Sequence, residues 1–293
     1  MQSVLLVVNP FASSVTEERI QAVQAELARV ADVRLERTTG PEHATRLARD
    51  ADGDAVVVFS GDGTYNEVLN GIDARPVGFV PGGGTSVLPR ALGIPRDARR
   101  AAAQIAEAIE RERTRRISLG RVNGRRFSFS AGIGFDAEAV RRLDSLGRND
   151  DGERPGDLTF AVTLARMLAE RRARWAPTLE IDGLGRAAFA FVANGDPYTY
   201  AGPVGIHVAP EARFELGLDL VAPTELRATS IPRFLRFALT GRRLPGGVLS
   251  GHDLDRIVVR CDRPQPLQVD GEDLGDVDLA VFEAERDAVS VLV

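Results

Sequence analysis

A glycine-containing segment directly after an apolar run is the feature that most constrains the fold. Ala55–Phe59 reads Ala-Val-Val-Val-Phe, and Ser60–Glu67 follows with Ser-Gly-Asp-Gly-Thr-Tyr-Asn-Glu. A continuous apolar run that ends at a glycine turn is typical of a buried strand in a parallel sheet. The glycines allow backbone conformations closed to other residues, and we expect Thr64 to cap a helix over Tyr65–Asn70. The N–H groups at such a helix start favour a phosphate.

A second segment repeats this order of strand, glycine turn and helix. Val77–Val80 predicts a strand, Pro81–Thr85 a turn rich in glycine, and Val87–Leu92 a helix. A single Gly-Asp-Gly is more often an ordinary turn than a site. Two glycine turns that leave successive strands form a crevice, and we predict the phosphate site there.

Strands and helices alternate through the first part of the chain. The other predicted strands are Ser3–Val8, Val33–Arg37 and Asp54–Phe59, and the other predicted helices are Glu17–Val30, Pro41–Asp50 and Asp97–Arg113. The alternation predicts an α/β domain over residues 1–114 with a doubly wound parallel sheet. Ligands of such sheets bind at the carboxyl edge, where the loop Asn9–Ser14 also leaves its strand, so this edge is the predicted nucleotide site.

After about Thr114 the pattern changes to short strands and glycine turns. The predicted strands are Arg116–Val122, Arg125–Ala131, Thr178–Ile181, Ala187–Ala193, Leu218–Val221, Ile257–Cys261 and Leu267–Val269. They predict a mainly β sandwich domain over residues 115–293, with the last residues either in this sandwich or packed back on the first domain. A helix over Leu158–Trp175 follows the polar loop Asp144–Asp157.

The composition excludes several chemistries. All 37 basic residues are arginine, so no lysine can hold a phosphate or form a Schiff base. Backbone N–H groups, helix dipoles, a metal or arginine forks remain for phosphate binding. A net charge of −5, without a basic stripe interleaved with aromatics, predicts no nucleic-acid partner.

The single Cys261 excludes an intrachain disulfide framework and a cysteine metal cluster. The N-terminus opens straight into Val4–Val8 without a charged leader. No apolar stretch approaches the ~20 residues that span a bilayer. We therefore expect a cytoplasmic protein whose membrane contact is peripheral, at the inner membrane face.

Seven motifs occur in a defined order along nearly the whole chain. They are Asn9-Pro10, Ser60–Val68, Pro81-Gly82-Gly83 with Arg90 and Leu92–Pro95, Ala131–Ala137, Val192–Gly195, Ala209–Ala212 and Val269–Glu272. In these motifs the chain resembles the diacylglycerol kinase catalytic domain superfamily, which includes bacterial lipid kinases and sphingosine kinases and has NAD kinases as distant relatives. An ordered set of this kind is far more specific than one glycine loop.

The resemblance implies ATP-dependent phosphorylation of a lipid hydroxyl, most often of diacylglycerol or a related lipid, with ATP between the domains and Mg²⁺ as cofactor. It implies that Asp62 and Asp136 hold the metal. It implies Asp62, Asp270 and Glu272 as catalytic residues, with Glu272 ranked first as the base. The implied nucleotide contacts are Asn9, Pro10, Ser13, Thr38, Ser60, Gly61, Asp62, Gly63, Thr64, Asn66, Glu67, Gly83, Gly84 and Thr85.

Several of these residues have plainer interpretations. From spacing alone, Asp270-Gly271 is a hairpin turn, and only its place in the family order promotes Glu272. Asp136 also fits as a cap on a short helix over Ala137–Leu143. Leu216 stands where bacterial members place a magnesium-binding aspartate, so we carry over no ligand there. The three histidines lack ligand spacing, and we expect packing or surface roles for them.

Two segments are candidates for contact with a lipid surface. The first is Ile231–Leu239 with Arg242 and Arg243, which mixes basic and large apolar residues. Its alternative is an ordinary packed helix whose arginines extend to solvent. The second set is Leu164, Met167, Leu168 and Trp175 beside Arg166, Arg171, Arg172 and Arg174. An exposed edge strand near Ala187–Ala193 would allow a homodimer.

Three functions remain open: a lipid kinase, a soluble enzyme like an NAD kinase, and a catalytically silent lipid or nucleotide binder. The downstream motifs Gly134–Ala137, Asn194-Gly195 and Asp270–Glu272 favour the lipid kinase over the NAD kinase. The altered segment Gly84–Val87 and Leu216 favour the silent binder, whereas the retained Asp62 and Glu272 oppose it.

Overall fold

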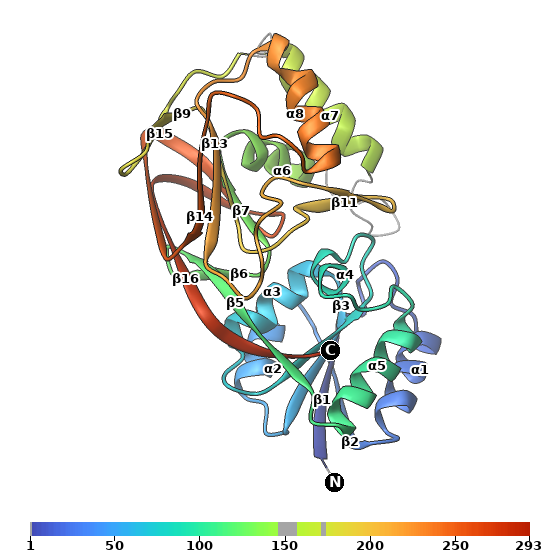
Figure 1. The fold of residues 1–293 in the computed structure, drawn as a ribbon. Helices are drawn as coiled ribbons and strands as arrows, with labels where there is room; N and C mark the ends of the chain where they lie inside the picture. The colour runs from blue at the N-terminus through green and yellow to red at the C-terminus, as the bar shows by residue number, and fades with distance from the viewer. Residues whose placement is uncertain (1, 146–156, 171–173) are drawn as a thin grey trace. The chain divides into compact units, whose positions relative to one another are not determined.

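The computed structural model describes residues 2–145, 157–170 and 174–293, which divide into two units (Figure 1). Unit 1 comprises Met1–Leu119 and Arg286–Val293, and unit 2 comprises Gly120–Glu285. The chain passes between the units within strands β5 (Thr114–Val122) and β16 (Glu272–Leu292). The domain boundary predicted at residues 114 and 115 stays a prediction.

Unit 1 contains a parallel sheet in the order β2-β1-β3-β4, and the end of β16 pairs beside β4. The strands are β1 (Gln2–Val8), β2 (Ala31–Arg37), β3 (Ala55–Ser60) and β4 (Val77–Pro81). Every residue of β3 is buried, as its continuous apolar run predicts. The predicted parallel sheet is confirmed.

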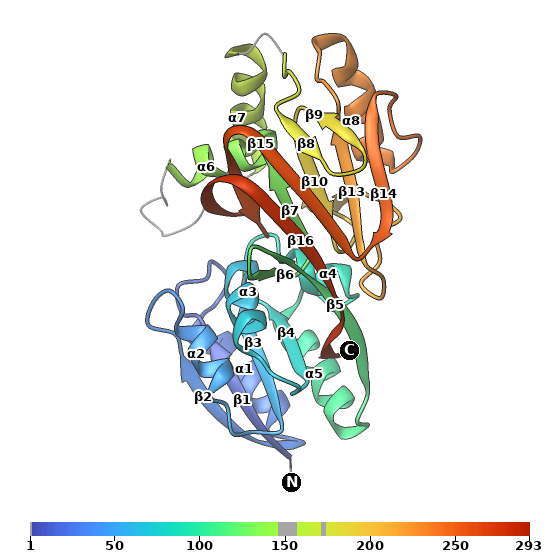
Figure 2. The same cartoon turned by 90° about the vertical axis from the view of Figure 1, so that its left-hand side faces the viewer.

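Helices cover both faces of this sheet (Figure 2). They are α1 (Glu17–Leu27) and α5 (Ala98–Glu110) on one face, α2 (His43–Arg49) and α3 (Asp62–Gly71) on the other, and the short α4 (Val87–Ala91) after β4. From β1 the chain moves outward to β2, and from β3 it moves outward to β4 on the other side. The strand order therefore reverses between β1 and β3, which is the position where open α/β sheets bind ligands.

Unit 2 is built mainly of antiparallel strands, as the sequence predicts. The central order is β14-β13-β10-β7-β15-β16. The strands not yet given are β6 (Arg125–Phe127), β7 (Ser130–Ile133), β8 (Leu179–Ile181), β9 (Gly185–Ala187), β10 (Ala190–Ala193), β11 (Thr199–Ala201), β12 (Val204–Ile206), β13 (Leu218–Pro223), β14 (Val248–Leu254) and β15 (Arg256–Val269). Phe127, Val192, Leu220 and Phe282 are among the buried residues of its core.

Three α-helices and a 3₁₀ turn accompany these strands among the described residues. They are α6 (Phe135–Ser145), α7 (Asp157–Glu170), the 3₁₀ turn Ala228–Ser230 and α8 (Ile231–Thr240). A second apolar cluster contains Trp175 and Phe189, with Leu168 of α7 and Phe234 of α8 packed against it. Within the described ranges, no helix is long and apolar enough to cross a membrane.

Several predicted elements differ from the structure. The helix expected over Leu158–Trp175 is described over Asp157–Glu170, and Trp175 lies outside it in a β-bridge with Leu226. Most of the loop Asp144–Asp157, together with Arg171 and Arg172, lies outside the described residues. In the second set proposed for lipid contact, Met167 and Trp175 are buried, so the prediction is wrong for these two residues.

The strand expected over Arg125–Ala131 breaks between β6 and β7. The N–H groups of Ser128, Phe129 and Ser130 in and beside this break donate to the side chain of Asp270. The edge strand expected near Ala187–Ala193 is also wrong for β10, because β10 pairs with β7 on one side and β13 on the other. This part of the basis for a homodimer is therefore lost.

Gly71 tests the packing of α2 against α3. A Cβ at this position would overlap the backbone carbonyl oxygen of Thr45, whereas a Cβ at Gly40 would meet no atom within 4 Å. We expect Gly71→Ala to lower the free energy of unfolding by about 2 kcal/mol or more, because backbone atoms must move. Gly40→Ala is the matched control and should cause no loss. Calorimetric unfolding of the two variants checks this, and equal transition temperatures would contradict it.

Candidate active site

The two glycine turns of unit 1 lie against each other at the carboxyl edge of the sheet. The N–H of Gly82 donates to the carbonyl of Ser60 at 2.6 Å. A Cβ on Gly83 would lie 2.8 Å from the Cα of Gly61, a distance that real Cβ atoms essentially never show. Glycine is therefore required here because the two backbones approach so closely.

Helix α3 begins at Asp62, two residues before the predicted cap. Gly61 is the N-cap residue with an extended backbone, so the prediction that Thr64 caps the helix is wrong. The Thr64 hydroxyl instead accepts hydrogen bonds from Ser60 Oγ at 2.8 Å and from Asn9 Nδ2 at 3.0 Å. These bonds join the loop after β1 to the turn after β3, across the point where the strand order reverses.

The Asp62 carboxylate, in the turn after β3, accepts hydrogen bonds from residues that follow the turn after β4. Its Oδ2 accepts from the N–H of Val87 at 2.9 Å and its Oδ1 from the N–H of Leu88 at 3.1 Å. These donors lie at the start of α4, where an anion is favoured by the helix dipole. Ser86 directly before them has φ +48°, a left-handed conformation. Asp62 thus holds the turn in place, and its role toward a metal stays a prediction.

A cavity of about 200 Å³ opens beside the second turn. Its lining residues are Ser14, Arg19, Pro81, Gly83, Gly84, Thr85, Ser86, Arg96, Asp97 and Ala98. Arg19 donates to the carbonyl of Ser14 at 2.8 Å, and the exposed Arg96 makes no hydrogen bond or ion pair with any described residue. Two guanidinium groups beside a glycine turn and the N-terminus of α5 suit an anion.

Sequence reasoning missed Ser14, Arg19 and Arg96. The signal that could have identified Arg96 is its position directly before Asp97, which caps α5 by accepting from the N–H of Arg100 at 2.9 Å. Arg19 lies in the first turn of α1 and carried no local signal. The predicted loop residue Ser13 is exposed, and its neighbour Ser14 lines the cavity instead.

The other predicted nucleotide contacts lie in different surroundings. Gly63 and Gly84 face open space, because a Cβ on either would meet no atom within 4 Å. These open glycines, the backbone donors of the turns and the two arginines fit the phosphates of a nucleotide. Pro10 in the first loop is exposed, Thr38 at the end of β2 is buried, and Thr85 lines the cavity.

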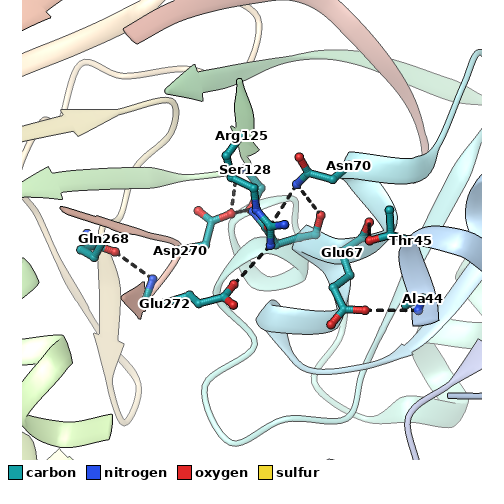
Figure 3. A network of polar contacts seen from close by, with 11 residues as sticks. Ala44, Thr45, Glu67, Asn70, Arg125, Ser128, Gln268, Asp270 and Glu272 are labelled. Atoms are coloured by element: carbon teal, nitrogen blue, oxygen red, sulfur yellow. Dashed lines mark hydrogen bonds and ion pairs between the residues drawn. The ribbon is translucent and has the colours of Figure 1, made fainter. Parts of the chain in front are cut away.

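Asn66 and Glu67 form hydrogen bonds with residues of helices α3 and α2. Asn66 is buried and accepts from Asn70 Nδ2 at 3.0 Å through its own Oδ1. Glu67 Oε2 accepts from the N–H of Ala44 in α2 at 3.2 Å (Figure 3). The contact of these two side chains with a nucleotide stays a prediction.

Asp270 in unit 2 is a buried structural carboxylate. It lies with Gly271 in the turn between β15 and β16, and their φ values of +48° and +79° confirm the predicted hairpin turn. The carboxylate accepts from Ser128 N at 2.7 Å and Ser128 Oγ at 2.9 Å (Figure 3). It also accepts from Phe129 N at 3.0 Å and Ser130 N at 3.2 Å. Four donors satisfy its lone pairs, so it is poorly placed to take a proton from a substrate.

Glu272 lies two residues further on, in a different environment. Its side chain is 46% exposed, whereas Asp270 is 6% exposed. Its carboxylate forms one ion pair, with Arg125 Nη2 at 3.3 Å (Figure 3). Of the two acids, Glu272 is therefore the more accessible to solvent.

Asp136 is a buried carboxylate that α6 directs toward this turn. The helix begins at Phe135, so the interpretation of Asp136 as its cap is wrong. Its Oδ2 accepts from Gln268 Nε2 at 2.9 Å and from Tyr198 at 3.3 Å, while its buried Oδ1 has no hydrogen-bond partner among the described residues. Burial raises the pKa of Asp136 to about 6. A Cβ on Gly132 would overlap this carboxylate, so a glycine is required beneath it.

Gln268 links Asp136 to the turn that carries Glu272. While its Nε2 donates to Asp136, its Oε1 accepts from the N–H of Gly271 at 2.9 Å. Arg141, also on α6, binds Asp273 through Nε at 2.8 Å and Nη2 at 3.0 Å and lowers the pKa of that carboxyl. Helix α6 therefore holds both strands of the hairpin, one on each side of Glu272.

The described residues contain no group of three or more histidine, cysteine or acidic side chains that could hold a metal ion. Near Leu216, the buried Asp219 accepts instead from His252, with Nδ1 at 2.8 Å from Oδ1. His207 pairs in the same way with Asp196 at 2.7 Å. Magnesium in phosphoryl-transfer sites needs only one or two protein carboxylates beside the substrate phosphates, and Asp62 is the acid that lies at the turns.

Comparison with known proteins agrees with this geometry. A family model described as the diacylglycerol kinase catalytic domain matches residues 3–122, and one described as the YegS C-terminal NAD kinase beta sandwich-like domain matches residues 129–293. The chain belongs to the diacylglycerol kinase family. Its membership supports a kinase of the diacylglycerol or lipid type and confirms the predicted α/β unit with a β sandwich.

Individual members of the family cover different shares of the chain. A diacylglycerol kinase of Bacillus subtilis is 30% identical over 252 residues, which are 80% of this chain and 77% of that protein. A relative from Streptococcus pneumoniae is 28% identical over 171 residues, only 55% of either chain. The crystal structure of a diacylglycerol kinase from Bacillus anthracis covers 99% of this chain and 96% of its own, with a TM-score of 0.72 at 20% identity, which shows the shared fold.

The raised pKa of Asp136 predicts a pH-dependent stability for this family member. The ordinary pKa is 3.8, so between about pH 4 and pH 6 the folded protein keeps a proton that the unfolded chain has lost. The contribution of Asp136 to the free energy of unfolding should therefore fall by about 3 kcal/mol as the pH rises through this interval and stay level above it.

Asp136→Asn removes the titrating group and should remove this slope. Urea unfolding of both proteins across the interval, with a chelator present, checks this. The same slope in the native protein and the variant would show that the slope has another source.

Proposed function

We propose that the protein transfers the γ-phosphate of ATP to the hydroxyl group of a lipid, diacylglycerol or a related molecule. The observation that carries this proposal is the pair of glycine turns that touch through Gly61 and Gly83 and are closed by Asp62. They present backbone donors at the sheet edge where a family of lipid kinases holds its nucleotide.

Unit 1 would bind the ATP. Phosphoryl transfer requires mainly that the phosphates be positioned and their charge be neutralised. Since the chain has no lysine, the backbone of Gly61–Thr64 and Gly83–Thr85 would supply neutral donors, and Arg19 and Arg96 would supply positive charge. Asn9, which orders the first loop through Thr64, would contact the nucleotide beside them.

Mg²⁺ would neutralise the β- and γ-phosphates when bound, and the proposal assigns it to Asp62, with Asp136 as the second predicted ligand. Asp62 is only partly buried, and its carboxylate lies at the two glycine turns, where it accepts from the N–H groups of Val87 and Leu88. Activity should therefore require magnesium and stop when a chelator removes it.

Unit 2 would supply the base. The carboxylate of Glu272 would take the proton from the lipid hydroxyl as that oxygen attacks the γ-phosphorus, and the bond to the bridging oxygen of ADP would break. Asp270 would keep the turn in shape, because it is buried and accepts four hydrogen bonds. A cytoplasmic location at the inner membrane face remains a prediction from the sequence.

The transfer itself is tested with radiolabelled ATP, magnesium and a panel of lipids in mixed micelles. We expect labelled lipid from the native chain and at least a 100-fold loss in Asp62→Ala and Glu272→Ala. Asp73→Ala and Asp278→Ala replace exposed acids of unit 1 and of β16 and serve as matched controls with full activity.

If the native chain binds ATP but labels no lipid, the proposal fails in favour of a silent binder. If NAD becomes labelled and lipid does not, a soluble enzyme like an NAD kinase replaces it. Circular dichroism of each variant separates lost chemistry from lost folding.

Substitutions of Glu272 and of Asp270 should have different effects on activity and stability. Glu272→Gln should leave the free energy of unfolding within about 0.5 kcal/mol of the native value, because the side chain is half exposed, while kcat falls. Asp270→Ala should lower that free energy by about 3 kcal/mol or more, because it leaves buried donors unpaired. Urea unfolding and kcat measured on both variants check this. An active Glu272→Gln with native stability would exclude Glu272 as the base.

A further inference from the structure

Helix α8 has a wider apolar surface than unit 2 covers. Ile231 and Phe234 pack against the apolar cluster around Trp175, and Phe237 is buried. Leu235 and Leu239, one helical turn apart, are 57% and 48% exposed. Since residues four apart share a helix face, these two leucines form one apolar stripe that faces solvent.

Unpaired arginines accompany this stripe. Arg233 and Arg236 on α8, and Arg242 and Arg243 after its C-cap Gly241, are exposed. None of the four guanidinium groups forms a hydrogen bond or an ion pair with a residue that the structure describes. Exposed Leu244 follows them directly.

The charge of this segment contrasts with that of the chain. Between Glu225 and Asp253 there is no acidic residue and there are five arginines, in a protein whose net charge is −5. A helix with leucines on one side and arginines beside them is the signature of a helix that lies in a membrane interface. Its charge is complementary to anionic lipid headgroups.

We propose that α8 and the segment after it dock on a bilayer that contains anionic phospholipids. Leu235 and Leu239 enter the boundary between headgroups and acyl chains, and the four arginines bind phosphate groups at the headgroup level. A second copy of the chain is a poorer occupant of this face, because a symmetric contact would place the arginines of both copies together.

The position of α8 is set by unit 2 itself. The N–H of His207, directly after β12, donates to the carbonyl of Ala238 at 2.7 Å, and the N–H of Gly241 closes the helix on Phe237. The Leu235 stripe is therefore held outward by packing on its opposite side. The inference rests on the proposed function only in that a kinase of a bilayer lipid needs such a surface.

The test is sedimentation of the whole protein with vesicles of phosphatidylcholine alone or mixed with phosphatidylglycerol. We expect binding only to the mixed vesicles, weakened by salt. Arg233→Gln with Arg236→Gln should weaken the partition coefficient about 25-fold, at about fivefold per arginine. Leu235→Glu with Leu239→Glu should abolish binding, whereas Leu184→Glu, at a leucine 43% exposed on the β8–β9 hairpin, should leave it unchanged.

Two results would overturn the proposal: native protein that stays in solution with the mixed vesicles, or a Leu235 and Leu239 double variant that binds as well as the native chain. A dimer in solution that this double variant dissociates would assign the face to a second copy.

Phosphorylation of a short-chain, water-soluble diacylglycerol separates the two proposals. If the double variant phosphorylates this lipid but no longer binds vesicles, both the docking surface and the kinase activity are supported. If the native chain binds vesicles but phosphorylates no lipid, the proposed kinase activity is refuted and the docking surface is still supported.

Discussion

The contact between two backbone turns is the constraint on which the proposed nucleotide site of unit 1 depends. Gly61 and Gly83 approach within a distance that excludes a Cβ, and the N–H of Gly82 reaches the carbonyl of Ser60. Asp62 then ties this pair to the start of α4. Because the turns are held by backbone atoms and one carboxylate, their N–H groups keep a defined direction without a lysine to organise them. Arg19 and Arg96 add charge at the border of the site and leave its geometry to the backbone.

Unit 2 places two acids two residues apart in opposite environments. Asp270 is buried and accepts four hydrogen bonds, whereas Glu272 is half exposed and meets one arginine. Two carboxylates in environments that differ in this way can have different roles, one in holding the structure and one in proton transfer. Helix α6 supports the arrangement through Asp136 with Gln268 on one strand and through Arg141 with Asp273 on the other. Glu272, the proposed base, thus lies between residues that are hydrogen-bonded to α6, to Gly271 or to both.

The same residue type serves two purposes in this lysine-free chain. Arginines such as Arg141 and Arg126 form close ion pairs with Asp273 and Glu285 and hold strands and helices together. The arginines of α8 and of the segment after it have no such partners among the described residues and lie beside exposed leucines. A guanidinium is suited to both situations, since it binds carboxylates and phosphates through the same planar fork. The difference between the two groups of arginines lies in the acidic residues around them. Arg141 and Arg126 have carboxylates beside them, whereas no acidic residue occurs between Glu225 and Asp253.

Local sequence pattern determined the parallel sheet, the two glycine turns, the hairpin at Asp270-Gly271 and the β-rich second unit, because apolar periodicity and glycine placement act over a few residues. The tertiary structure alone decided what the polar side chains do. It placed the start of α3 at Asp62 and not at Tyr65, bonded Asn66 to Asn70 and Glu67 to Ala44, and brought Arg19 and Arg96 to the cavity. The partners of Asp62 lie 25 and 26 residues away in sequence, and those of Asp270 lie 140 to 142 residues away. Hydrogen bonds over such separations leave no local pattern, so the distinction between Asp270 and Glu272 arises only when the chain is folded.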